Sequence, residues 1–74
     1  LSTELIDILK FISNQKVLGK NVTFKDIGHH FNITAPTTQK RIQSLEEKGL
    51  IKINKQGRNK ILELTNSANM FISQ

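Results

Sequence analysis

The chain has 74 residues, a formal net charge of +5 at pH 7 and no cysteine. A chain of this length buries only part of the surface that it exposes when unfolded, so a large enclosed active site is not expected. The absence of cysteine excludes disulfide bonds, thiol nucleophiles and thiolate metal ligands. Apolar runs of two or three residues are far shorter than the roughly 20 of a membrane span, and no signal-peptide core is present. We therefore expect one cytoplasmic domain over residues 1–74, without membrane contact.

Positive charge is concentrated in the second half of the chain. Residues 34–60 carry seven Lys and Arg side chains against Glu46 and Glu47, a net charge of +5, whereas residues 1–33 carry +1 and residues 61–74 carry −1. Such a concentration is typical of a surface that meets a polyanion, although a solvated basic surface that aids solubility has the same composition.

An amphipathic helix is predicted at the start of the chain. Apolar residues recur at i, i+3, i+4 and i+7, namely Leu5, Ile8, Leu9 and Ile12. This spacing predicts a helix over residues 3–14 that is capped by Ser2 or Thr3. Residues 15–22 are expected to form a loop, with a brief strand at residues 21–23 that could join a later hairpin.

A second, shorter helix is predicted to follow Thr23. Thr23 and Asp26 stand three residues apart, as in a capping box in which Asp replaces the usual Glu. Its inward face would be formed by Phe24, Ile27 and Phe31. Gly28 costs a helix about 1 kcal/mol relative to Ala, which indicates that another helix passes close by. In the short turn over residues 30–34, Asn32 tolerates a left-handed conformation, so the next helix should cross this one steeply.

The third helix is predicted to be capped by Thr34, to run to about Lys48 and to stop at Gly49. Pro36 falls in its first turn, where a missing amide proton is harmless. The inward face consists of Thr38, Ile42 and Leu45, at i, i+4 and i+7. The outward face consists of Pro36, Thr37, Lys40, Gln43 and Ser44, with Gln39 and Arg41 on its flanks. The outward face is therefore polar, rich in amides and basic.

A hairpin is predicted after this helix. Residues 50–54 and 60–64 alternate apolar and polar side chains on either side of KQGRN, with Gly57 at the tip and Lys55, Arg58 and Lys60 around it. The side chains expected to close over the helices are Leu50 or Ile51, Ile53, and Leu62 or Leu64. Residues 66–74 hold enough apolar side chains for a short helix or a frayed end. That tail would either cover the first helix or form a dimer contact.

The stretch over residues 27–53, IGHHFNITAPTTQKRIQSLEEKGLIKI, resembles the winged helix-turn-helix core of several regulator families. They are the multiple-antibiotic-resistance-type regulators, the metal-dependent iron repressors, the amino-terminal domain of the SOS repressor, and small archaeal and viral regulators. Ile27 takes the family's aliphatic position, Gly28 its small-residue position, Asn32 the position of the turn glycine, and Thr34 the capping position. The segment over residues 45–51, LEEKGLI, is the most recognisable part.

The resemblance implies an α+β fold, a three-helix core with a two- or three-stranded antiparallel wing and a short C-terminal helix. Two departures stand out. Thr38 replaces the commoner Val or Ile, and these 74 residues include no long flanking dimerisation helix or sensor domain. A homodimer through the first helix and the C-terminal segment is expected, while binding of an effector stays open.

These residues together predict a sequence-specific regulator of transcription, a repressor rather than an activator, that binds a palindromic or repeated site in double-stranded DNA. The helix from Thr34 to Lys48 would enter the major groove, and the wing from Lys55 to Lys60 would meet phosphates or the minor groove. Glutamine amides pair with adenine, and Lys and Arg reach guanine or phosphate. The candidate contact residues are Thr23, Lys25, Ala35, Pro36, Thr37, Gln39, Lys40, Arg41, Gln43, Ser44, Lys55, Gln56, Arg58, Asn59 and Lys60.

Other chemistry has weaker support. His29 and His30 are adjacent, so on a helix they point about 100° apart and cannot grip one metal without further ligands. One of them is expected at the surface and the other partly packed. The four glycines are isolated and form no phosphate loop. We expect no cofactor, no metal and no catalysis; RNA binding, replication-origin binding and a protein-interaction module remain as alternative functions.

Overall fold

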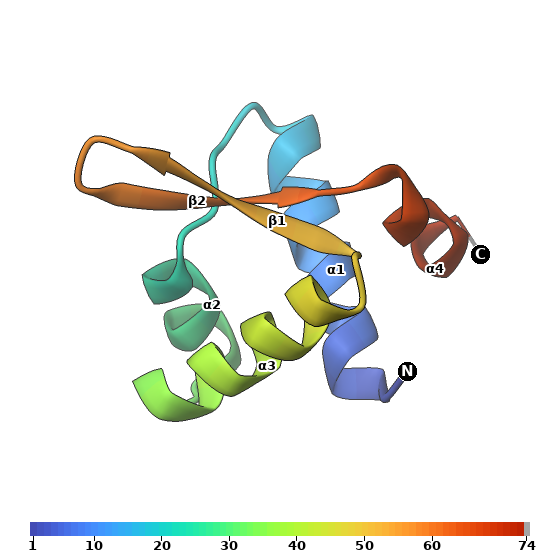
Figure 1. Ribbon diagram of the computed structural model, residues 1–74, viewed down its shortest axis with the longest axis horizontal. Coiled ribbons are helices and arrows are strands. Elements are labelled where there is room, and N and C mark those ends of the chain that lie inside the picture. Colours follow the sequence, from blue (N-terminus) through green and yellow to red (C-terminus); the bar gives the residue numbers. More distant parts are fainter. Residues whose placement is uncertain (74) are drawn as a thin grey trace.

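The computed structural model describes residues 1–73 and consists of four α-helices, one short 3-10 helix and a two-stranded antiparallel sheet. The sheet lies across three of the helices, and its turn projects past them (Figure 1). The turn of the hairpin and the short helix over residues 69–72 lie at opposite ends of the longest axis, which measures 32 Å (Figure 1). This is the winged helix-turn-helix architecture that the sequence predicts.

Helix α1 spans Thr3–Val17 and buries Ile8, Leu9 and Ile12. The Ser2 hydroxyl caps it by accepting a hydrogen bond from the Leu5 amide at 3.3 Å. The prediction that this helix ends at residue 14 is wrong by three residues. The polar side chains at 15 and 16 do not break the helix, which ends only where Gly19 adopts a positive φ of 76°.

Helix α2 spans Phe24–Phe31, and its capping box is confirmed. The Thr23 hydroxyl accepts from the Asp26 amide at 3.3 Å, and the Asp26 carboxylate accepts from the Thr23 amide at 2.9 Å. Asn32 ends the helix in the predicted left-handed conformation, with φ 54° and ψ 50°. Of the predicted inward face, Ile27 is fully buried, whereas Phe24 and Phe31 are half-buried and pack against the edge of the core.

Helix α3 spans Ala35–Glu47 between Thr34 and Lys48, close to the predicted bounds. Its predicted inward side chains, Thr38, Ile42 and Leu45, are all buried. Gly28 of α2 lies where the two helices meet: a Cβ there would lie 3.2 Å from Thr38 Oγ1 and 3.3 Å from the Ile33 carbonyl oxygen. The close approach of helices expected from Gly28 is therefore present.

The hairpin consists of β1, Ile51–Gln56, and β2, Asn59–Leu64, joined by a two-residue turn. Both strands reach further toward the tip than predicted, so residues 55, 56 and 59 belong to strands rather than to a five-residue loop. Gly57 makes this possible, because its φ of 63° at the first turn position is typical of the turns that match the twist of a hairpin. In place of the brief strand expected at residues 21–23, one isolated bridge joins Val22 to Leu62, with the Leu62 amide donating to the Val22 carbonyl at 2.8 Å.

The core lies between the three helices and the inner face of the hairpin. It consists of Ile8, Leu9, Ile12, Val22, Ile27, Ile42, Leu45, Leu50, Ile51, Leu62 and Ala68. Leu50 and Ile51, between which the sequence did not choose, are both buried; Leu62 is buried, and Leu64 is half-buried at the edge.

The C-terminal segment forms a 3-10 turn, Asn66–Ala68, and a short helix, α4, Asn69–Ile72. This segment packs against α1 and buries Ala68 completely. The expectation that the tail covers the first helix is confirmed for residues 66–73, while Gln74 lies outside the described residues. None of the helices within residues 1–73 has the length and apolar character needed to cross a membrane.

Candidate nucleic-acid interface

The amino-terminal turn of α3 is held by a short chain of hydroxyl groups. The Thr34 hydroxyl accepts from the Thr37 amide at 3.3 Å and donates to the Thr37 hydroxyl at 3.0 Å. The buried Thr38 hydroxyl donates to the Thr34 carbonyl at 2.9 Å, which satisfies the one polar side chain in the core. The departure of Thr38 from the aliphatic pattern is thus accommodated, and the start of α3 is presented in a defined orientation.

The candidate contact residues of α3 differ in how exposed their side chains are. Ala35, Pro36, Gln39, Lys40 and Gln43 are exposed, whereas Thr37, Arg41 and Ser44 are half-buried. The Ser44 hydroxyl accepts a hydrogen bond from the Lys48 ammonium at 3.1 Å. The exposed polar side chains in this set are therefore two amides and a lysine, the types that read base edges and phosphates.

Strand register divides the polar side chains of the wing between two faces. Lys55 pairs directly with Lys60, and both share the face of Ile53 and Leu62, which is turned toward the helices. Two like charges directly opposite each other destabilise a hairpin. Such a pair is therefore better explained by binding of an anion than by stability of the fold.

The other face of the wing carries a different set of polar residues. Gln56 pairs with Asn59, and Lys52 pairs with Glu63, with 3.9 Å between the Lys52 ammonium and a Glu63 carboxylate oxygen. Arg58 occupies the turn itself. Of the basic side chains in the hairpin, Lys52 is the one that is turned away from α2 and α3.

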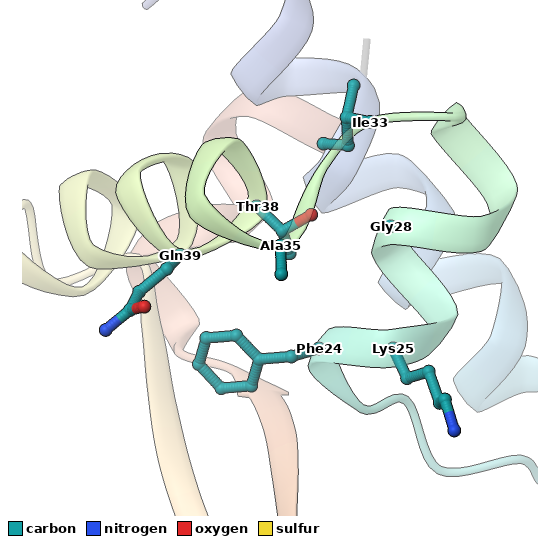
Figure 2. A pocket seen from close by; sticks show the side chains of 7 residues that line it. All are labelled: Phe24, Lys25, Gly28, Ile33, Ala35, Thr38 and Gln39. Carbon is teal, nitrogen blue, oxygen red and sulfur yellow. The ribbon is translucent and has the colours of Figure 1, made fainter.

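Three hollows meet at Phe24, where α2, α3 and the wing come together. The largest, about 490 Å³, lies between α2 and α3 and is mainly apolar (Figure 2). Its lining residues are Phe24, Lys25, Gly28, Ile33, Ala35, Thr38 and Gln39. Figure 2 shows the Phe24 ring directed toward α3, whereas the Lys25 side chain points away from the ring.

The two smaller hollows lie beside the wing. One, about 300 Å³, is lined by Thr23, Phe24, Lys25, Arg58, Asn59 and Lys60. The other, about 240 Å³, is lined by Phe24, Gln39, Ile42, Gln43, Glu46, Ile53 and Lys60. Candidate residues from three separate elements are thus brought to one concave region. The candidates that line none of these three hollows are Pro36, Thr37, Lys40, Arg41, Ser44, Lys55 and Gln56.

The amino terminus of α2 differs from the expectation that Thr23 is available to a phosphate. The Thr23 hydroxyl donates to Asp26 Oδ2 at 3.1 Å, and the same carboxylate accepts from the Thr23 amide. The helix supplies its own anion to its positive end, so Lys25 is the better candidate there. It is exposed and lines the 300 Å³ hollow.

The two histidines occupy the far side of α2. The His30 ring stacks on Phe11 with 4.1 Å between ring centroids, and it meets the edge of Phe31 at 4.7 Å. His29 is exposed and borders a hollow between α1 and α2. Across residues 1–73, no three side chains of His, Cys, Asp or Glu type come together to hold a metal ion.

Phe24 and Glu46 line the concave region but were not among the sequence-based candidates for DNA contact. Phe24 was assigned to the inward face of α2 from its helical spacing, and Glu46 entered only the charge count of residues 34–60. The position of Phe24 in the first turn, next to the cap, places it at the rim of the core. Glu46 follows Gln39 by seven residues, which places both on one side of α3.

Comparison with known proteins agrees with this geometry. Residues 6–52 match the family model described as winged helix-turn-helix DNA-binding. No match was found among curated proteins.

Solved structures of two transcription regulators are similar along almost the whole chain. MepR, a transcription regulator of the Staphylococcus aureus multidrug efflux pump MepA, is 24% identical with a TM-score of 0.90, over 99% of this chain and 53% of MepR. The S. aureus MepR–DNA complex gives 23% identity and a TM-score of 0.88, over 99% and 52%. The adhesin competence repressor AdcR from Streptococcus pyogenes is 25% identical with a TM-score of 0.84, over 99% and 53%.

These likenesses concern the fold, and this chain spans about half the length of the solved proteins. The match to the family model is stronger evidence of family membership than the structural likenesses, because it covers α1, α2, α3 and the start of the wing, well over half of the chain. The chain therefore belongs to the winged helix-turn-helix DNA-binding family.

Proposed function

We propose that this chain is a single winged-helix domain, over residues 1–74, of a cytoplasmic, nucleoid-associated transcriptional regulator that binds specific sites in double-stranded DNA and represses. The observation that supports this most directly is the concave region around Phe24. There the amides of Gln39 and Gln43 on α3 and the ammonium of Lys60 on the wing border one hollow.

In the proposed complex, α3 lies in the major groove. Gln39 and Gln43 pair with base edges, and Lys40 and Arg41 reach guanine or phosphate, while Ala35, Pro36 and Thr37 contact a thymine methyl group or the backbone. Ser44, one helical turn after Lys40, contacts the sugar-phosphate backbone of the DNA.

The wing then follows the sugar-phosphate backbone. Lys55 and Lys60 extend from its inner face, Arg58 from its turn, and Gln56 and Asn59 from the outer pair next to the turn. Lys25, and Thr23 where its cap opens, meet the phosphates at the start of α2. Phosphate contacts of this kind set register and affinity, whereas the amides of α3 provide the choice of sequence.

A dimer would fit a palindromic or repeated site. The apolar side chains at the junction of α1 and α4 support the proposal: Leu5, Phe71 and Ile72 are half-buried, and Leu1 and Met70 are 44% and 68% exposed. We place the dimer contact there, at the end of the molecule remote from the wing turn.

The test is a titration of the chain with mixed-sequence duplex DNA, single-stranded DNA and RNA in rising salt, followed by selection of bound sites from random duplexes. The expected result is salt-sensitive binding that is tightest for duplex DNA, with enrichment of one sequence. Tighter binding of RNA would support the alternative function as an RNA-binding module. Absence of salt-sensitive duplex binding would contradict the proposal.

A further inference from the structure

Phe24 is placed differently from the other apolar residues of α2. Ile27, one turn later, is fully buried, whereas Phe24 is half-buried and borders all three hollows between α2, α3 and the wing. Its ring extends from α2 toward α3 (Figure 2). A residue needed only to fill the core would not have to lie where three surface hollows meet.

Lys60 meets this ring. Its ammonium nitrogen lies 5.9 Å from the centre of the Phe24 ring, within the range of a cation–π contact. Strand register supports this placement independently, because Lys60 has the same parity as Leu62 and Leu64 and therefore projects toward the helices. Lys60 also lines both hollows beside the wing, each time together with Phe24.

The hollow between α2 and the wing gathers three cations. Lys25, Arg58 and Lys60 line it, and no carboxylate is among its lining residues. Asp26, which is next to Lys25 in the sequence, accepts hydrogen bonds within the capping box of α2. Three like charges around one space of about 300 Å³ repel one another, so the arrangement favours an anion between them.

We propose that Phe24 is a positioning residue for DNA binding, which holds the Lys60 ammonium over the cleft between α2 and the wing, where one backbone phosphate lies between Lys60 and Lys25. This inference rests on the proposed function and refines it. A lysine on a flexible stem loses rotamer freedom when it binds phosphate, and a ring that orders the side chain beforehand reduces this loss. The ring thereby joins the wing to the helix-turn-helix as one binding surface.

The first measurement needs no DNA. Side-chain methylene protons held over an aromatic ring resonate upfield, so the Lys60 methylene signals in the free protein should be shifted. The shift should persist in Phe24→Tyr and disappear in Phe24→Leu, which keeps apolar bulk but lacks a ring. Unshifted Lys60 signals in the wild type would overturn the inference.

The second measurement is a double-mutant cycle on duplex binding with Phe24→Leu and Lys60→Gln. At this exposed site the ring contact corresponds to about two- to fivefold in affinity. Phe24→Leu should weaken binding by that factor, and it should have no further effect in a Lys60→Gln background. Phe24→Tyr should bind as the wild type does. Effects that simply add would overturn the inference.

The dependence of affinity on salt separates positioning from packing. Each phosphate contact contributes about −0.9 to the slope of log K against log salt for duplex DNA. Although it removes no charge, Phe24→Leu should make the slope shallower, toward that of Lys60→Gln. A purely structural role would lower the melting temperature and affinity and leave the slope unchanged, which would overturn the inference.

The matched control is Lys52→Gln, which removes the same charge from the outer face of the same hairpin. It should show no coupling to Phe24→Leu, and equal coupling would overturn the inference. A wild-type chain that fails to bind duplex DNA would instead overturn the proposed function, and with it the DNA role of Phe24. Normal duplex binding with additive variants would overturn the role of Phe24 alone.

Discussion

The polar side chains of α3 differ in their hydrogen-bond partners and in their exposure. Thr38 is buried and hydrogen-bonded to the Thr34 carbonyl. Thr37 is hydrogen-bonded to the Thr34 hydroxyl, and Ser44 is hydrogen-bonded to Lys48. Gln39 and Gln43 are exposed, on the side of α3 that faces the wing. The choice of base sequence is therefore expected to depend on these two amides more than on the hydroxyl groups.

Replacing Gln43 by alanine should relax the sequence preference at one base pair. An amide that pairs with adenine contributes about 1–3 kcal/mol of discrimination, so binding to the preferred site should fall while binding to unrelated duplexes stays the same. Competition between the selected site and single-base variants measures this. Gln15→Ala on α1 is the control and should change neither the affinity for the preferred site nor the sequence preference. An equal loss of affinity for all sequences in Gln43→Ala would contradict the assignment of Gln43.

Gly28 is predicted to be intolerant of even a methyl group. Alanine there gains about 1 kcal/mol of helix propensity, but its Cβ would lie 3.2 Å from Thr38 Oγ1 and 3.3 Å from the Ile33 carbonyl oxygen. Neither neighbour is the free end of a flexible side chain, because Thr38 is hydrogen-bonded and the carbonyl belongs to the backbone. Overpacking costs about 1–3 kcal/mol, so we expect a net destabilisation of about 1 kcal/mol.

Chemical denaturation measures the effect of Gly28→Ala. Part of the loss should disappear in a Thr38→Ala background, where one of the two close contacts is gone. A Gly28→Ala chain that is more stable than the wild type would show that α2 and α3 separate easily.

At the scale of elements, the wing is built for binding at some cost in stability. Its inner face sets Lys55 directly opposite Lys60, while the pair on the outer face, Lys52 and Glu63, has opposite charges. The same two strands thus present a repulsive pair toward the proposed DNA surface and an attractive pair away from it.

Lys55→Gln should weaken DNA binding without lowering stability. Removing one of two like charges relieves repulsion in the free hairpin, so the melting temperature should stay equal or rise, while the affinity for all duplexes falls. Thermal melting and a salt titration measure both. Lys52→Gln should cause a smaller loss of affinity and no rise in the melting temperature. A Lys55→Gln chain with a lower melting temperature than the wild type would contradict this account.

Arg58→Ala tests the turn of the wing. The side chain is exposed and next to Gly57, so its removal should leave the fold intact and weaken binding to all sequences. The slope of log K against log salt should decrease by about 1, as for the loss of one phosphate contact. An unchanged slope would place the turn away from the DNA.

At the scale of the whole molecule, the large exposed apolar side chains of residues 1–73 fall into two groups. Leu1 and Met70 lie at the junction of α1 and α4, and Val17 and Leu18 lie at the other end of α1. Leu5, Phe71 and Ile72 of the same two helices are half-buried apolar residues, whereas Val17 is 83% exposed at a helix end. This difference favours the α1–α4 junction as the dimer contact.

Met70→Glu should therefore convert a dimer into monomers, because a charge at the centre of an apolar contact is costly to bury. Sedimentation equilibrium measures the oligomeric state, and the variant should still bind a half-site but lose its preference for the palindrome. Val17→Glu is the matched control and should remain dimeric. A dimer that Val17→Glu disrupts and Met70→Glu does not would contradict the proposed contact.

The sequence by itself determined the elements whose signals are local. The caps at Thr23 and Thr34, the left-handed Asn32 and the inward face of α3 follow from hydrogen bonds and spacings within a few residues, whereas the first cap was left open between Ser2 and Thr3. Local signals were weaker at the end of α1 and at the hairpin turn. In both places polar residues were taken for a loop, although they continue a helix or a strand.

Only the tertiary structure decided which faces meet. The packing of α2 against α3 and the wing brings Phe24, Gln39 and Lys60 together from positions far apart in the chain, and strand register separates Lys60 from Lys52. Helical spacing alone made Phe24 a core residue, because periodicity gives the face of a helix but not what lies at the rim of that face. The contacts between elements depend on packing over the whole core, which no short stretch of sequence specifies.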